Sequence, residues 1–219
     1  MRVVAKPLVC LGEALVDLIC PDPVDSPAEA TRFEVHPGGA LANVAVAASR
    51  AGAPAALASA CGADDRGRFL RRRLGAAGVD LGFYGELAGV PTPFAFACLD
   101  RELEPSFEIH AVGIDDAIAS LAGREEEVAA AAGAVVFGSN TLAEERSRAV
   151  TRAVVGGAIE RGVPILFDPN LRPGRWTAIA TARESCLAFL PDATVLRCNL
   201  AEARLLAGDE GLGAAAAAA

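Results

Sequence analysis

Short apolar runs alternate with segments of helical periodicity over most of the chain. The strand–helix pairs are 54–60 with 64–77, 134–138 with 142–161, 164–167 with 176–189, and 194–198 with 200–207. Strands that are apolar throughout are typical of a parallel sheet with both faces covered, because neither face meets water. The pattern therefore predicts an α/β fold with helices on both sides of the sheet. In such folds, ligands bind at the carboxyl ends of the strands.

Two segments alternate with a period of two instead. In 13–20, one face carries Glu13, Leu15, Asp17 and Ile19, and the other carries Ala14, Val16, Leu18 and Cys20. In 92–110, two strands at 94–99 and 106–110 flank the polar turn 100–102. Alternating strands inside an α/β chain favour a small sheet that stands apart from the main one, as a lid does. We expect one domain over 1–219, with lid segments at about 13–36 and 90–112.

Composition and charge narrow the class of protein. The 219 residues are 53% hydrophobic and carry a net charge of −8, which argues against binding to nucleic acid or to an anionic membrane surface. We find neither a secretory signal nor an apolar segment long enough to span a bilayer, and we expect a cytoplasmic protein. The six scattered cysteines are then expected to be buried free thiols, and two histidines do not favour a zinc site.

The most informative motif lies between these regions. Gly38 and Gly39 directly precede a strong helix former, so the backbone can approach a ligand closely and expose free helix N–H groups. Asn43, about one turn later, both donates and accepts hydrogen bonds, as a polyol requires. Taken alone, the two glycines fit a plain loop-to-helix entry better than a binding site.

The run G-G-A-L-A-N-V-A, followed by Gly52 and Gly62, resembles the first signature of the ribokinase-like family, also called phosphofructokinase-B-type carbohydrate kinases. The resemblance implies a ribokinase-like, Rossmann-type parallel sheet with a small β lid. It also implies that Gly38, Gly39 and Asn43 hold sugar hydroxyls, and that Asp17, in the opening strand 12–17, accepts hydrogen bonds from them. Thr92 resembles the start of the lid strand. Leu41 departs from the family, which usually has proline or a small residue there.

Two later motifs follow in the family's order. D-P-N-L-R-P at 168–173, followed by Trp176, is an ordinary turn in composition, but it resembles fructokinases and 2-keto-3-deoxygluconate kinases. That resemblance implies a substrate-side role for Arg172, whose guanidinium suits sugar oxygens; the alternative is that it orients Asp168. Asn199 and Glu202 form an N-x-x-E pattern, which as a bare pattern is a helix cap. In the family it organises Mg²⁺ and the phosphate end of ATP, with Glu202 acting on the metal indirectly.

The glycine-rich G-A-G-D segment that carries the family's general-base aspartate occurs nowhere in this sequence. We therefore expect that the C-terminal strands are missing, that the alanine-rich stretch 213–219 opens a helix, and that this chain is inactive or very weak. The apolar sheet edge left behind predicts poor solubility. The resemblance also implies a homodimer through the lid. His110 is expected to be an edge-strand residue and not a substrate ligand.

Two alternatives remain at this point. The first is a sugar-binding or regulatory fragment that never catalyses. The second is a nucleotide-dependent oxidoreductase of Rossmann type, which would show G-x-G-x-x-G after the first strand. Here the first strand runs into Glu13 and Asp17, which disfavours an oxidoreductase.

Overall fold

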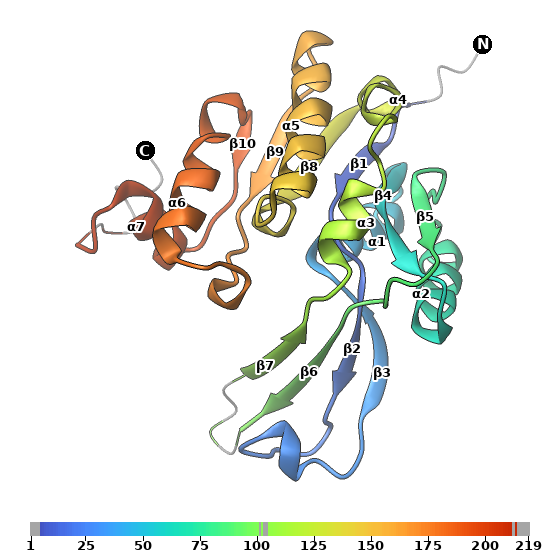
Figure 1. Ribbon diagram of the computed structural model, residues 1–219, viewed down its shortest axis with the longest axis vertical. Helices are drawn as coiled ribbons and strands as arrows, with labels where there is room; N and C mark the ends of the chain where they lie inside the picture. The colour runs from blue at the N-terminus through green and yellow to red at the C-terminus, as the bar shows by residue number, and fades with distance from the viewer. Residues whose placement is uncertain (1–4, 101, 103–104, 212, 214–219) are drawn as a thin grey trace.

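A six-stranded parallel sheet forms the main body of the protein in the computed structural model, which describes residues 5–100, 102, 105–211 and 213 (Figure 1). The strand order is β10-β9-β8-β1-β4-β5. The strands are β1 (Leu8–Leu11), β4 (Ala55–Gly62), β5 (Tyr84–Leu87), β8 (Ala134–Gly138), β9 (Ile165–Asp168) and β10 (Val195–Leu196). Every paired neighbour in this sheet runs parallel, as the predicted α/β fold requires.

Helices cover both faces of this sheet, and the side chains on each face belong to a different apolar cluster. Cys10 on β1 packs with α1 (Ala40–Arg50) and α2 (Asp65–Ala76), whereas its neighbours Val9 and Leu11 pack on the opposite face. The second face is covered by helices from the later part of the chain, which are α3 (Ile114–Ala119), α4 (Glu125–Ala131), α5 (Glu145–Glu160), α6 (Ile179–Leu187) and α7 (Leu200–Ala207). None of the helices in the described part of the chain combines the length and the apolar character needed to cross a membrane.

A second sheet of four strands projects away from the main body (Figure 1). Its order is β3-β2-β6-β7, with β2 (Leu15–Ile19), β3 (Glu34–Gly38), β6 (Phe94–Leu99) and β7 (Pro105–His110). The small sheet gathers an aromatic cluster on the face that carries His110. The His110 ring stacks on Phe94 with 4.4 Å between ring centroids, and Phe96 meets it edge-on. His110 is the last residue of β7, which is an edge strand of the small sheet, as expected.

A buried polar contact ties the small sheet to the main body where the chain enters β6. Thr92 is 1% exposed, and its hydroxyl lies 2.7 Å from Asp64 Oδ1 and accepts a 2.9 Å bond from the Gly62 N–H. Asp64 Oδ2 accepts a further 2.9 Å bond from the Thr92 N–H. Because Asp64 also caps α2 by accepting from the Gly67 N–H, one carboxylate fixes both the helix start and the strand entry.

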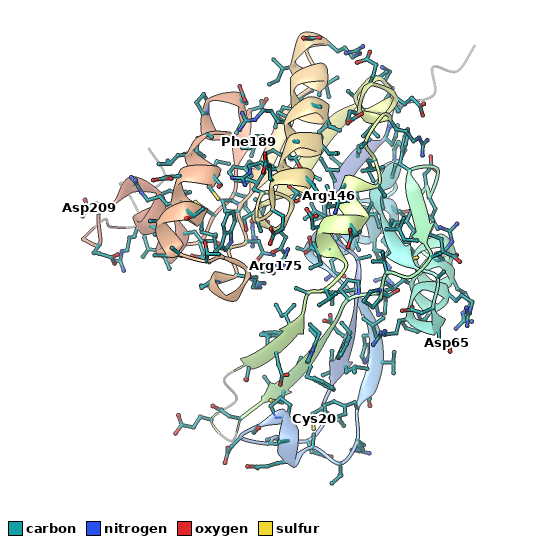
Figure 2. The ribbon with its side chains drawn as sticks, in the orientation of Figure 1. Cys20, Asp65, Arg146, Arg175, Phe189 and Asp209 are labelled. Atoms are coloured by element: carbon teal, nitrogen blue, oxygen red, sulfur yellow. The ribbon has the colours of Figure 1, made fainter. Side chains whose placement is uncertain are left out.

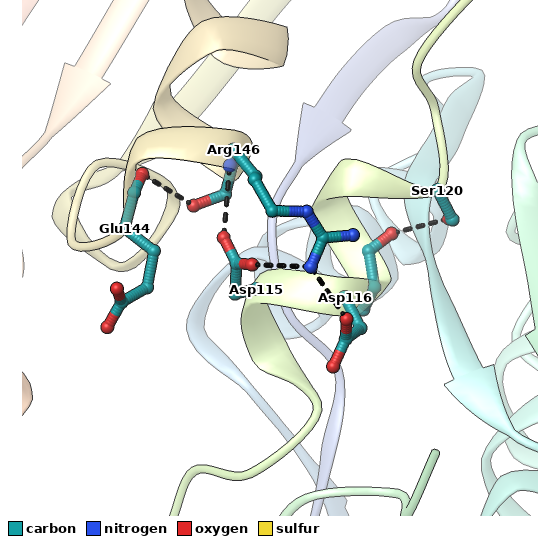
Figure 3. Close-up of polar contacts among 7 residues, drawn as sticks. Asp115, Asp116, Ser120, Glu144 and Arg146 are labelled. Atoms are coloured by element: carbon teal, nitrogen blue, oxygen red, sulfur yellow. Dashed lines mark hydrogen bonds and ion pairs between the residues drawn. The ribbon is translucent and has the colours of Figure 1, made fainter. Parts of the chain in front are cut away.

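A second contact lies just beyond the end of β7, at the start of α3 (Figure 3). Arg146 of α5 bonds Asp115 and Asp116 at 3.3 and 3.0 Å. The N–H of Ser147 donates to Asp115 Oδ1 at 3.0 Å, so the same carboxylate satisfies a free donor in the first turn of α5. The chain leaving the small sheet is thus anchored on the helix that covers β8 and β9.

The predicted elements agree with the structure in type, and they differ in extent. The strand expected at 194–198 is the two-residue β10, and the helix expected at 176–189 is the shorter α6. β3, β5, α3 and α4 were not predicted individually. All six cysteines are free, as expected, but only five are buried, because Cys198 is half-buried. Burial raises the pKa of the Cys10 thiol to about 12. The helix expected over 213–219 lies, apart from Gly213, outside the described residues.

Candidate functional site

A hollow of about 340 Å³ lies where the carboxyl ends of the main-sheet strands face the small sheet. The residues that follow β1, β8 and β9 form its floor, the start of α1 forms one side, and β2, β6 and β7 form the roof. The residues lining it are Glu13, Leu15, Asp17, Gly39, Ala40, Asn43, Ala95, Phe107, Ile109, Ile114, Asn140, Asn170, Arg172 and Arg175. Glu13, Leu15 and Asp17, which the alternation in 13–20 placed on one face, all line this hollow, hereafter the inter-sheet pocket.

Asp17 of this pocket lies against Gly38, which does not itself line the pocket. Gly38 is paired with Leu15 across β2 and β3, two positions from the Asp17–His36 pair. A Cβ atom placed on Gly38 would lie 2.0 Å from Asp17 Oδ2, so no other residue fits without moving the carboxylate. Burial raises the pKa of Asp17, and the nearby His36 opposes that shift. When ionised, Asp17 presents only hydrogen-bond acceptors to the pocket.

Gly39 makes a second close approach. Its φ of 97° favours glycine, and a Cβ atom there would lie 2.5 Å from the Glu13 carbonyl oxygen. Gly39 caps α1, so the helix begins at Ala40 against the pocket, and Asn43 faces the pocket from the first turn. The structure thus brings together Asp17, Gly38, Gly39 and Asn43, which the sequence motif pointed to separately.

Glu13 and Asn140 were not recognised as site residues from the sequence. Glu13 is only 2% exposed, and its Oε1 accepts bonds from the Ala40 N–H at 3.2 Å and from Asn140 Nδ2 at 3.1 Å. Burial raises its pKa, and the bonds to Asn140 and Ala40 together with the charge of Arg175 oppose the shift. The available signal was position, because each residue follows the end of a buried parallel strand.

The arginines of the loop after β9 differ in their contacts. Arg172 lines the pocket, and its Nη1 donates to the carbonyl oxygens of Asn170 and Leu171 at 3.3 and 3.1 Å. It does not orient Asp168, which forms a 2.8 Å ion pair with Arg197 instead. Arg175, which the sequence did not single out, also lines the pocket. Figure 2 shows it on the side of the main body that faces the small sheet.

Asn199 and Glu202 form a capping box at the start of α7. Glu202 Oε2 accepts from the Asn199 N–H at 2.9 Å, and Asn199 Oδ1 accepts from the Glu202 N–H at 2.9 Å. Glu202 Oε1 accepts a 2.7 Å bond from the Leu171 N–H, which ties α7 to the loop after β9. Neither residue is among those that line the inter-sheet pocket. Within the described residues, no group of three or more His, Cys, Asp or Glu side chains is arranged to hold a metal ion.

The family model for pfkB family carbohydrate kinases matches residues 5–219. This chain belongs to that family. Fructokinase-1 of rice (Oryza sativa subsp. japonica) is 33% identical over 201 residues, which cover 92% of this chain and 62% of the rice protein. Fructokinase-1 of maize (Zea mays) is 32% identical over 201 residues, again 92% of this chain and 62% of the relative. The chain therefore spans less than two thirds of the length of these pfkB relatives.

Solved pfkB structures share the fold. A PfkB protein from Polaromonas sp. JS666 superposes with a TM-score of 0.84 at 26% identity, over 94% of this chain and 69% of that one. A sugar kinase from Pyrococcus horikoshii, solved in complex with ATP, has a TM-score of 0.80 at 29% identity, over 94% and 68%. The α/β fold, the parallel sheet with a second small sheet and the predicted family are confirmed.

The family also places Leu41 in context. The sequence resemblance implied proline or a small residue at position 41. Leu41 stands there instead, is 3% exposed and packs against Gly12 and Gly138. A Cβ atom on Gly12 would lie 2.6 Å from Leu41 Cγ, so the absence of a side chain at residue 12 makes room for the larger residue at 41. The departure lies in the core beneath the pocket and leaves Gly38, Gly39 and Asn43 in place.

Proposed function

We propose that this chain forms the sugar-binding part of an ATP-dependent carbohydrate kinase, fructokinase-like or 2-keto-3-deoxygluconate kinase-like. The observation that carries the proposal is the inter-sheet pocket, which gathers Asp17, Gly39 and Asn43 from separate elements. Its volume of about 340 Å³ fits a small molecule, since ligand sites typically measure roughly 300–1,000 Å³.

The pocket offers the mixture of partners that a polyol needs. Each sugar hydroxyl both donates and accepts, and a carboxylate such as Asp17 only accepts, whereas Asn43 does both. Arg172 adds a cation at the rim. Phe107 and Ile109 add apolar surface to the roof.

The phosphate end of the reaction is assigned to Asn199 and Glu202. Both Glu202 oxygens already accept backbone N–H bonds, which suits an indirect role toward Mg²⁺, through water, better than direct ligation. When bound, ATP would supply the phosphoryl group, and Mg²⁺ would neutralise the negative charge of the phosphates. We expect this chain to bind sugar and to transfer phosphate weakly or not at all, because its sequence holds no G-A-G-D segment. We further propose a cytoplasmic protein that dimerises through the small sheet.

Isothermal titration calorimetry with a panel of ketoses and sugar acids tests this proposal. We expect at least one sugar to bind the wild-type chain, Asp17→Asn and Asn43→Ala to weaken that binding by about 10- to 100-fold, and Asp65→Asn to leave it unchanged. Asp65 is an exposed aspartate at the start of α2, away from the pocket. Absence of binding by every sugar, or equal binding by the Asp17→Asn protein, would contradict the proposal.

The alternative function is that of a sugar-binding fragment that never catalyses. Unlike the proposed kinase, such a fragment would not consume ATP. The intact mass of the protein from its native source separates the two. A species substantially heavier than 22.3 kDa, with sugar-dependent ATP consumption, supports a complete kinase. A species of 22.3 kDa that binds sugar without consuming ATP supports the fragment.

A further inference from the structure

Arg175 lies in the short turn 173–175 between β9 and α6 and lines the inter-sheet pocket. It also lines a second hollow of about 700 Å³ that adjoins the first. The two hollows share Phe107, Ile109, Arg172 and Arg175 as a common wall. A ligand that occupies either hollow therefore contacts the surface to which Arg175 belongs.

One edge of the Arg175 guanidinium lacks hydrogen-bond partners. Its Nε and Nη2 atoms are shielded from solvent, and neither has a partner among the residues that the structure describes. These two N–H groups point the same way from the planar group, so together they form a two-pronged donor. Leaving buried donors unpaired is costly, and native proteins seldom do so. The edge therefore points to a missing acceptor that offers two oxygens.

Protein groups nearby do not supply that acceptor. Glu13 is near enough for its charge to interact with Arg175, but no ion pair joins them in the described part of the protein. Glu13 Oε1 is already occupied by Ala40 and Asn140. Glu13 Oε2 is buried without a hydrogen-bond partner, and no bond joins it to Arg175 among the residues that the structure describes. Arg172, the neighbouring guanidinium, is partly satisfied by the carbonyl oxygens of its own loop, so Arg175 is the less committed of the two.

We propose, resting on the sugar-binding function proposed above, that Arg175 binds a carboxylate group of the substrate and so makes this a site for sugar acids. The ligand's hydroxyls meet Asp17 and Asn43, and its carboxylate extends toward the wall shared by the two hollows. In the described residues, no hydrogen bond holds the Arg175 side chain in place. The side chain can therefore turn its Nε and Nη2 donors toward the ligand.

The chemistry of the edge and the charge of the pocket favour a carboxylate over other groups. A carboxylate presents two coplanar oxygens at the spacing of the guanidinium donors, whereas a hydroxyl presents a single oxygen. The pocket lining contains two acidic residues, Glu13 and Asp17, and two basic ones, Arg172 and Arg175. A singly charged group is therefore better tolerated beside Glu13 than a doubly charged phosphate. Burial raises the pKa of Glu13, which lessens its repulsion of an anion.

Calorimetry with three probes and three variants tests the inference. The probes are 2-keto-3-deoxygluconate as a sugar acid, fructose as a neutral ketose and fructose 6-phosphate as a phosphorylated sugar. The variants are Arg175→Leu, which removes the donors, Arg175→Lys, which keeps the charge but loses the two-pronged edge, and Arg72→Leu, an exposed arginine on α2, as the control.

We expect the wild-type chain to bind the sugar acid more tightly than fructose. Arg175→Leu should weaken sugar-acid binding by about 10- to 100-fold and leave fructose binding within about twofold, with Arg175→Lys in between. Arg72→Leu should match the wild type. A role of Arg175 in folding alone would weaken both sugars equally, so the difference between acid and neutral sugar is the decisive readout.

Three results would overturn the inference, and they are distinguishable from failure of the proposed function. If fructose binds with dependence on Asp17 while Arg175→Leu changes nothing, the sugar-binding proposal stands and the carboxylate assignment is wrong. If fructose 6-phosphate binds more tightly than the sugar acid and depends on Arg175, the anionic group is a phosphate. If no probe and no other sugar binds the wild-type chain, both proposals fail together.

Discussion

The carboxylate of Asp17 occupies the space that a side chain on residue 38 would need, since a Cβ atom on Gly38 would lie 2.0 Å from Asp17 Oδ2. The aspartate comes from β2 and the glycine from the end of β3, so the pairing of two strands sets the position of a pocket acceptor. A glycine that looks like part of a flexible loop in the sequence is thus a steric requirement of the site.

Gly38→Ala should therefore impair binding by displacing Asp17. We expect the affinity for the sugar that binds the wild-type chain to fall by about 10- to 100-fold, comparable to the loss of one hydrogen bond to a charged group. Calorimetry with that sugar measures the effect. Unchanged affinity would show that Asp17 does not contact the ligand or that the strands shift freely.

Gly156→Ala is the matched control for that substitution. Gly156 lies inside α5, and a Cβ atom there meets nothing within 4 Å. We expect unchanged sugar affinity and a gain of about 0.5–1 kcal/mol in the free energy of unfolding, because alanine favours a helix over glycine. Urea denaturation checks this, and a loss of stability would mean that the added methyl group is not accommodated on α5.

Glu13→Gln should change how stability depends on pH. Burial raises the pKa of folded Glu13 above its usual value of 4.5. As the pH rises above 4.5, the unfolded chain releases this proton first, so the wild-type free energy of unfolding falls until the pH passes the folded pKa. The glutamine side chain has no proton to lose. The free energy of unfolding of the Glu13→Gln protein should therefore fall less than that of the wild type between pH 4.5 and the folded pKa of Glu13.

Urea denaturation at several pH values from 4.5 to neutral measures this difference. Glu160→Gln, at an exposed glutamate that ends α5, should follow the wild type. Parallel curves for wild type and Glu13→Gln would mean that Glu13 is not held in a desolvated environment in solution.

Thr92→Val tests the contact that joins the small sheet to the main body. Valine keeps the shape but removes the hydroxyl, which leaves the Gly62 N–H buried without its partner. We expect a loss of about 1–3 kcal/mol in the free energy of unfolding. Thr31→Val, at an exposed threonine before β3, should change stability by less than about 0.5 kcal/mol. If the two substitutions changed the stability equally in thermal or urea denaturation, the Thr92 hydroxyl would not make the stabilising contact that we infer.

Local patterns in the sequence predicted the sheet, its helices and the glycine pair. Continuous apolar runs identify parallel strands, and the alternation at 13–20 separates the residues that face the pocket from those that do not. Asp17, Gly38, Gly39, Asn43 and Arg172 were named because a family motif carries them, and the structure places all five in or beside one pocket.

What the sequence did not predict depends on contacts between distant segments. Asn140 reaches Glu13 across 127 positions, and no local pattern records that distance. Arg175 is one of several arginines in polar turns, and its unpaired edge exists only because the loop after β9 folds beside the pocket. β10 was predicted too long because its exposed Val195 and Leu196 lie at the edge of the described sheet, where one neighbour stabilises a strand less than two.

That edge predicts the behaviour of the isolated chain. Val195 is 50% exposed on an edge strand, and such edges pair with other molecules. We expect the wild-type chain to form larger species as its concentration rises in sedimentation velocity, and Val195→Lys to reduce them. Val112→Lys, at a 71% exposed valine outside the strands, should not. A monodisperse wild-type profile with sharp, reversible thermal unfolding would contradict this prediction.

The pocket between the two sheets is central to the proposed function, because every sugar contact that we infer lies there. A crystal structure of the chain with the sugar that binds most tightly in calorimetry tests it most directly. We predict sugar hydroxyls within hydrogen-bonding distance of the Asp17 carboxylate and the Asn43 amide, beside Gly39. A sugar bound elsewhere, with Asp17 and Asn43 facing solvent alone, would contradict the assignment of this pocket.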